Sequence, residues 1–189
     1  AISTPAVEFA LASYSTVSDG EVLAYEQEGH PFLTWTFPTA DVTWSYDVRE
    51  HQWHQRARWN PADNTLHKWR ARGTCAPGSQ VTLVGDYLTG DLYILSLDRF
   101  DDNCARIKRV RRAPYPSAEN QYLFVHQIEM GIQSGVGLAA PPATITADIQ
   151  GTINLRLSRD SGNTFLAPRA ASLGTAGAWI GPRSSAAIS

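Results

Sequence analysis

The sequence predicts an all-β protein, organised as a partial β-propeller-like meander with about three blades' worth of strands. Hydrophobic and polar residues alternate with a period of two along most of the chain, and amphipathic helical spacing is nearly absent. Turn signals recur about every 8–12 residues and separate about a dozen short candidate strands. Six tryptophans and two Gly-Asp pairs occur along the chain, as expected of blades that hold four strands in about 40–50 residues.

The first blade is predicted over residues 22–58. Within residues 32–37 the large apolar side chains share one face and the threonines share the other, which is typical of a half-buried strand. The same alternation predicts a second strand over residues 43–48. A polar turn then leads into a third strand over residues 53–59. These segments together form a meander of the length of one blade.

A second blade is predicted from Leu66 to Leu97, and strand patterns continue beyond it. The later candidate strands cover residues 80–85, 91–97, 106–110, 122–130, 144–150, 153–157 and 164–167. Closed propellers need about 4–8 blades, so we expect open strand edges that other subunits or further sequence would cover. A Gly- and Pro-rich stretch at 134–142 predicts a division into blades (1–133) and a C-terminal strand group with a flexible tail (134–189).

An Asp box, the pattern S-x-D-x-G-x-T-[WF], lies in the C-terminal strand group. Its residues are Ser158, Asp160, Gly162, Thr164 and Phe165. The serine and aspartate can accept backbone N–H groups, and the glycine can adopt a positive φ. The motif therefore predicts a stabilised hairpin. In sialidase-like propellers such turns lie away from the catalytic centre, so the motif indicates fold and not activity.

Composition excludes several classes of protein. The chain has 189 residues, 43% of them hydrophobic, which suffices for an ordinary core. The net charge of -2 indicates no global attraction to nucleic acid or acidic membranes, and no run of about 18 apolar residues predicts a membrane span. Cys75 and Cys104 form no CxxC pair, which favours two free thiols. The start has neither an initiator Met nor a signal-peptide pattern, so we expect a piece of a longer chain or a processed product.

No catalytic, cofactor or metal site is predicted. A glycosidase would need paired carboxylates or a tyrosine nucleophile with an acid/base partner, and the acidic residues of this chain form no such constellation. His51 and His54 have a metal-like spacing, but positions three apart on a strand point to opposite faces. We interpret the two histidines as exposed polar residues at a hairpin. The sequence therefore predicts that the protein is not an enzyme.

One segment concentrates positive charge. Its cations are Arg106, Lys108, Arg109, Arg111 and Arg112. Alternation predicts a cationic strand that could contact a phosphate backbone without sequence preference. The charges could equally keep an edge strand from aggregating, or anchor an acidic neighbouring subunit. The excess of arginine (14) over lysine (2) favours bidentate pairing at an interface.

Several motifs in order along the chain resemble one family. They are AISTPAVE at 1–8, YEQEGH at 25–30, FPTAD at 37–41, TW at 43–44, YD at 46–47, WHQR at 53–56, GD at 85–86, GDLY at 90–93 and LSRDSGNTF at 157–165. In these motifs the chain resembles the packaged-DNA stabilisation proteins, or tail accessory (nozzle) proteins, of short-tailed bacteriophages. The resemblance extends from residue 1 to about residue 178.

The resemblance implies a structural protein of the virion tail, assembled in the host cytoplasm. Family members form a ring beneath the portal, help to retain the packaged genome and later belong to the channel for DNA ejection. Their implied partners are portal and other tail proteins, and their implied fold is a β-propeller with added β-structure. The chain departs from the pattern at its start and after residues 177–179. The alternative from another class is a carbohydrate-binding or sialidase-like propeller fragment, supported by the Asp box and the tryptophans.

Overall fold

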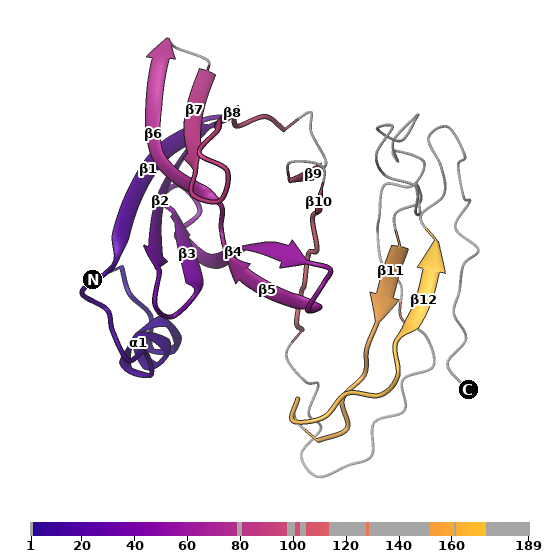
Figure 1. Ribbon diagram of the computed structural model, residues 1–189. Helices are drawn as coiled ribbons and strands as arrows, with labels where there is room; N and C mark the ends of the chain where they lie inside the picture. The colour runs from indigo at the N-terminus through magenta and orange to yellow at the C-terminus, as the bar shows by residue number, and fades with distance from the viewer. Residues whose placement is uncertain are drawn as a thin grey trace. The chain divides into compact units, whose positions relative to one another are not determined.

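The computed structural model describes residues 2–78, 81–97, 101–102, 105–113, 128, 152–160 and 162–172. These residues form mostly antiparallel β-sheet together with one short helix (Figure 1). The chain separates into two units, residues 1–109 and 110–189. The strands predicted over 122–130 and 144–150 and the predicted boundary at residue 133 lie outside the described residues, apart from residue 128.

The first unit contains a five-stranded antiparallel meander in the order β1-β2-β3-β4-β5. Its strands are β1 (Glu21–Gln27), β2 (His30–Phe37), β3 (Val42–Asp47), β4 (Gln52–Asn60) and β5 (Thr65–Lys68). Glu28 and Gly29 form a two-residue turn between β1 and β2, with φ of 51° and 74°, which is the left-handed conformation that tight hairpins require. The three strands predicted from alternation between residues 32 and 59 are confirmed.

A three-stranded antiparallel sheet follows in the same unit. It comprises β6 (Ala71–Gly78), β7 (Val81–Asp86) and β8 (Leu92–Ile94). A Cβ added to Gly85 would lie 2.8 Å from the carbonyl oxygen of Arg72 on the paired strand, so only glycine fits there. Gly73, with φ of 63°, lies at a register shift in β6, where one extra residue is accommodated as a bulge. β8 is shorter than the strand predicted over residues 91–97.

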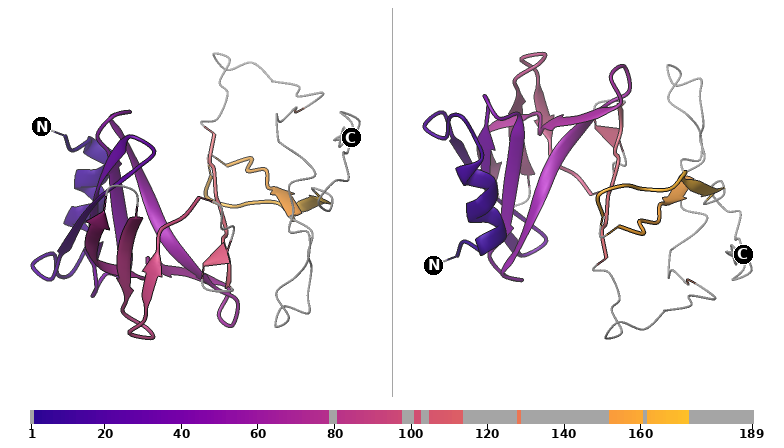
Figure 2. Two further views of the ribbon diagram at one scale, coloured as in Figure 1. Left: turned by 90° about the horizontal axis from the view of Figure 1, so that it is seen from above. Right: turned by 90° about the horizontal axis from the view of Figure 1, so that it is seen from below.

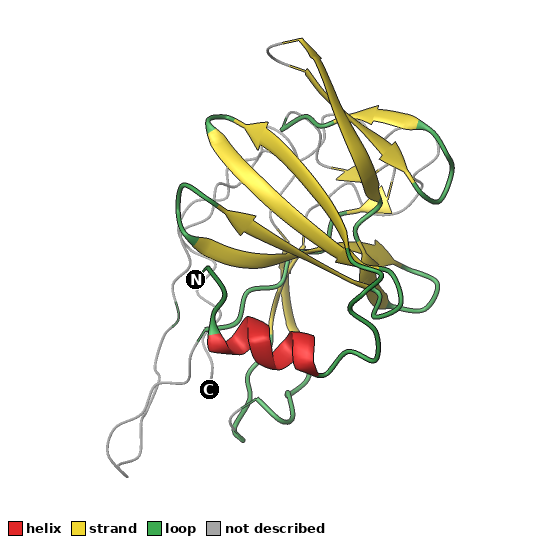
Figure 3. Ribbon diagram, turned by 90° about the vertical axis from the view of Figure 1, so that its left-hand side faces the viewer, coloured by secondary structure: helices red, strands yellow, loops and turns green. Residues whose placement is uncertain are grey.

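Helix α1 (Pro5–Ala12) was missed by the sequence analysis. Its start has local signals, because the Thr4 hydroxyl accepts the Val7 N–H at 3.4 Å and proline occupies the first turn. With eight residues it is too short for a helical period to stand out. The helix lies on one face of the β1–β5 sheet (Figure 2, Figure 3), where Val7 is only 3% exposed.

Small hydroxyl side chains fill the most buried part of this sheet. Thr34, Thr43 and Ser45 are the largest side chains that are fully buried among the described residues. Thr34 bonds to Ser45 and Thr36 to Thr43, each at 3.0 Å across the β2–β3 pair. The apolar face predicted for β2 is less buried than its threonine face, because these paired hydroxyls satisfy one another and can be covered.

Two short antiparallel pairs complete the described strands. They are β9 (Asp101–Asp102) with β10 (Ala105–Arg106), and β11 (Thr152–Leu155) with β12 (Arg169–Ser172). The strand predicted over residues 164–167 is wrong, since these residues belong to the loop that joins β11 to β12. Within the described ranges the sheets do not close, and no propeller ring is formed. What the structure shows is therefore the all-β class and the meander.

Candidate functional sites

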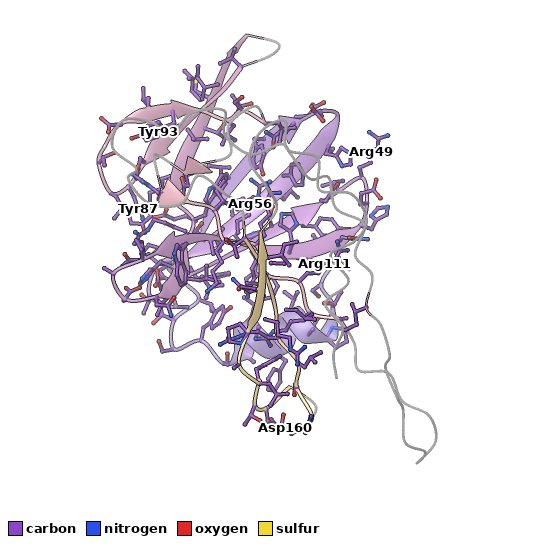
Figure 4. The ribbon with its side chains drawn as sticks, turned by 90° about the vertical axis from the view of Figure 1, so that its right-hand side faces the viewer. Arg49, Arg56, Tyr87, Tyr93, Arg111 and Asp160 are labelled. Carbon is purple, nitrogen blue, oxygen red and sulfur yellow. The ribbon has the colours of Figure 1, made fainter. Side chains whose placement is uncertain are left out.

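The Asp box lies in the loop between β11 and β12. Asp160 accepts hydrogen bonds from the Thr164 N–H at 2.7 Å and from the Thr164 hydroxyl at 2.5 Å. The Ser158 hydroxyl accepts the Gly162 N–H at 2.7 Å and donates to Asp160, also at 2.7 Å. Gly162 has φ of 92°, a conformation that favours glycine. Figure 4 labels Asp160 at the end of this loop.

The hydrogen bonds within the turn favour the ionised form of the Asp160 carboxylate. Hydrogen bonds from the Thr164 hydroxyl and N–H, and then from Ser158, lower the pKa of Asp160 to about 2. The carboxylate is therefore ionised at neutral pH, with both of its oxygens bonded within the turn. A carboxylate in this state cannot supply a proton to a leaving group, since a general acid needs a pKa near the working pH. The chemistry of the motif is that of a turn.

The basic segment, residues 106–112, differs from the predicted strand. Only Arg106 belongs to a strand, the two-residue β10, and residues 107–113 have no regular secondary structure. They are exposed, Val110 by 61%. The predicted strand over 106–110 fails because alternation puts cations on both faces, so neither face can be buried against a sheet.

Two cations of the basic segment contact aromatic rings. The ammonium of Lys108 lies 3.7 Å from the centre of the Trp59 ring in the first unit. In the second unit the Arg112 guanidinium lies 5.8 Å from the centre of Phe165, the last residue of the Asp box. No ion pair with the described residues engages Arg109 or Arg111, and Figure 4 labels Arg111. Rings hold a cation without cancelling its charge, so the segment can still bind an anion.

The sequence analysis did not identify Arg56, an arginine on β4 that contacts three aromatic rings. The guanidinium carbon of Arg56 lies 5.2 Å from the ring centres of Tyr25 and Phe32 and 4.9 Å from that of Trp69. Burial lowers the pKa of Arg56, and its Nε has no hydrogen-bond partner in the described structure. Figure 4 labels it beside the strands of the first unit. The rings come from three separate segments, so no local pattern could have predicted the cage.

The two histidines with the metal-like spacing, His51 and His54, have different neighbours. The Nδ1 of His51 and the hydroxyl of Tyr46 are 3.0 Å apart. His54 instead meets the ring of Phe32 edge-on, at 5.9 Å between centres. His51 occupies the turn before β4 with φ of 55°. Throughout the described ranges, no group of three or more histidine, cysteine or acidic side chains could hold a metal ion.

Tryptophans of the first sheet are used in packing. The Trp53 ring lies 5.2 Å from Trp35 and 6.3 Å from Trp44. Its indole N–H donates to the carbonyl of Ile2 at 2.8 Å, and that of Trp44 donates to the Tyr14 hydroxyl at 2.9 Å. These bonds hold the N-terminal segment on the sheet.

Comparisons with models of protein families, with curated proteins and with solved structures give no match.

The free thiol of Cys75 is exposed, and Cys104 lies outside the described residues. Among the described residues, no helix has the length and apolar character to cross a membrane.

Proposed function

We propose that this chain is a structural component of a bacteriophage or prophage tail. In this role it belongs to the ring that retains packaged DNA in the head and conducts it at ejection. The observation that carries the proposal is the ordered series of motifs that resemble those of the packaged-DNA stabilisation proteins. Several of these motifs have an evident structural reason in this chain, such as Gly85, where a side chain would strike the backbone of β6.

The finer fold that belongs to this proposal is an incomplete propeller. A four-stranded antiparallel meander is the topology of one propeller blade, and β1 to β4 have this topology. β6 to β8 supply three strands of a second blade. The Asp-box loop between β11 and β12 supports the same fold, because such turns recur in propellers. The open strand edges are then the surfaces that further sequence or neighbouring subunits cover.

In this proposal the basic segment provides the contact with DNA or with an acidic partner. Residues 107–112 are exposed and have no regular secondary structure, and no ion pair with a described carboxylate engages Lys108, Arg109, Arg111 or Arg112. An extended cationic segment can follow a phosphate backbone without reading its sequence. The proposed partners are the portal and other tail proteins, in a homo-oligomeric ring, and the proposed location is the virion tail. The proposal assigns no catalytic role to any residue.

Particle composition tests the proposal directly. Particles induced from the strain that carries the gene are separated on a density gradient and probed with an antibody against this chain. We expect the protein in DNA-filled, tailed particles and its loss from particles that have released their DNA prematurely. Portal and head-completion genes beside this gene would agree with that result. Absence of the chain from purified tailed particles would refute the proposal.

DNA contact is tested separately, by binding to fluorescent duplexes of two unrelated sequences. If the five cations neutralise five phosphates, the slope of log K against log salt is about -4.5, and the affinity should be similar for both duplexes. Changing all five cations of the basic segment to serine should abolish this binding. The matched control, Arg49→Ser with Arg159→Ser, removes exposed charge elsewhere and should leave it unchanged. Salt-insensitive binding, or equal binding by both variants, contradicts the assignment.

A further inference from the structure

Strand β5 carries a histidine that is held between two carboxylates. The Nδ1 of His67 lies 2.6 Å from Oδ2 of Asp41, and its Nε2 lies 2.9 Å from Oδ2 of Asp63. Asp41 belongs to the turn between β2 and β3, and Asp63 to the turn between β4 and β5. One side chain therefore joins two turns that are separated by 22 positions in the sequence.

The protonation state of the ring decides whether both contacts are favourable. A neutral imidazole has one N–H and one lone pair, whereas the imidazolium has two N–H donors. Both ring nitrogens of His67 face carboxylate oxygens, so only the imidazolium can donate to both aspartates. After loss of a proton, the ring can donate to only one of the two aspartates. The Thr65 hydroxyl, which lies 2.9 Å from Nε2 and donates to Asp63 at 2.7 Å, can then donate to the freed nitrogen instead, so the ring no longer bridges the two turns.

Other charged or titratable groups lie near this cluster. They are Lys68 on the same strand, Arg58 opposite His67 on β4, Asp19 bonded to the β2–β3 turn, and the Tyr87 phenol. Arg58 opposes protonation of His67, but the two carboxylates are in direct contact with the ring. Hydrogen bonding to Asp63, and then to Asp41, raises the pKa of His67 above its ordinary value.

We propose that His67 is a protonation-dependent clamp, which fastens β5 and the β4–β5 turn to the β2–β3 turn. Deprotonation releases the clamp while the sheet stays folded, because other contacts remain. The Lys68 N–H still donates to Asp41 at 3.1 Å, and the Thr65 N–H to Asp63 at 2.9 Å. Asp41 has a positive φ of 56°, a conformation that persists in a non-glycine residue only when its surroundings hold it. The inference is independent of the proposed function.

The sign of the pH dependence follows from the raised pKa of His67. The clamp contributes its full stability below the unfolded histidine value of about 6.5, and the contribution is lost as pH rises through the folded value. The first unit should therefore be tighter at pH 6 than at pH 8.5. An unclamped histidine with a depressed pKa would give the opposite trend.

Nuclear magnetic resonance of the full chain tests the clamp. The imidazole nitrogens are followed from pH 5 to 9 in the wild type, in His67→Gln and in the control variant His51→Gln. We expect His67 to titrate above the ordinary histidine value of about 6.5. The backbone amides of residues 39–41 and 63–65 should titrate with the same midpoint in the wild type and in His51→Gln, and lose this transition in His67→Gln.

Asp63→Asn gives a second test that retains the histidine. Removing one carboxylate should lower the midpoint of His67, whereas the matched exposed change Asp91→Asn should leave it in place. A midpoint at or below 6.5 in the wild type overturns the proposal. So does a raised midpoint whose titration leaves the amides of both turns unmoved, because His67 would then be protonated without clamping them.

Discussion

Replacing Asp86 by alanine is expected to destabilise the first unit by about 3–5 kcal/mol, the usual consequence of breaking a buried ion pair. Asp86 ends β7, and its side chain is 1% exposed. It pairs with the guanidinium of Arg70, which is 11% exposed, and it also accepts the Leu88 N–H at 2.7 Å and the Thr89 hydroxyl at 3.2 Å. The substitution leaves all three donors without this acceptor.

The loss of stability expected for Asp86→Ala comes mainly from the charge of Arg70, which stays buried without its partner. Burial alone would raise the pKa of Asp86, but hydrogen bonding and attraction to Arg70, with the Leu88 N–H, hold it below its ordinary value. Arg70→Met should therefore cost a similar amount, because it isolates the buried carboxylate. The double variant Arg70→Met with Asp86→Leu should cost less than either single change, since replacing both members of a buried pair by apolar groups is often nearly neutral.

Urea denaturation at pH 7, followed by tryptophan fluorescence and circular dichroism, measures these differences. Coincident transitions in the two signals would justify a two-state treatment of the first unit. Asp91→Ala is the matched control, because Asp91 lies in the same loop and its exposed side chain bonds only to the Tyr93 hydroxyl among the described residues. Its expected effect is within about 0.5 kcal/mol. A change below about 1 kcal/mol for Asp86→Ala, or a double variant as unstable as the worse single one, would refute the reasoning.

Four further predictions follow from the structure and the proposal. Thr34→Val should cost about 1–3 kcal/mol because it leaves the Ser45 hydroxyl buried and unpaired, and Thr34→Val with Ser45→Ala should recover most of that loss in the same denaturation assay. Asp160→Ala should lower the melting temperature, and an unchanged melting curve would contradict the role of Asp160 in stabilising the turn. In the wild type, the amide of Thr164 should lose its protection from exchange as pH falls from 3.8 through about 2, because the Asp160 carboxylate that accepts its N–H becomes protonated. Fluorogenic sialosides and other glycosides should show no turnover above a denatured control, and any such turnover would contradict the prediction that the protein is not a hydrolase. Light scattering after size-exclusion chromatography should show association through open edges, and a stable monomer at high concentration would count against the incomplete propeller.

The described strands that the sequence predicted correctly are those with a local cause. The alternation over residues 32–37 is a property of one strand, and the structure has β2 there. The Asp box is equally local, because its hydrogen bonds join residues no more than four positions apart. Such patterns act over a few residues and depend little on the rest of the fold.

The wrong predictions concern segments whose secondary structure depends on contacts with another part of the chain. Residues 106–110 and 164–167 alternate like strands, but a strand exists only when a neighbour accepts its hydrogen bonds. The eight-residue helix α1 depends on packing against the sheet, where its Val7 is buried and Tyr14, just after the helix, accepts the indole N–H of Trp44. An isolated helix of that length is not stable in water, so tertiary packing decided it.

The sequence by itself determined the all-β class, the meander of the first sheet and the bonding pattern of the Asp-box turn. Tertiary structure alone decided which faces are buried and which distant side chains meet. His67 meets Asp41 across 26 positions, and the rings around Arg56 come from three segments. Such contacts depend on strand register and on how the sheet curves. A shift of one residue in register would turn each of these side chains to the other face.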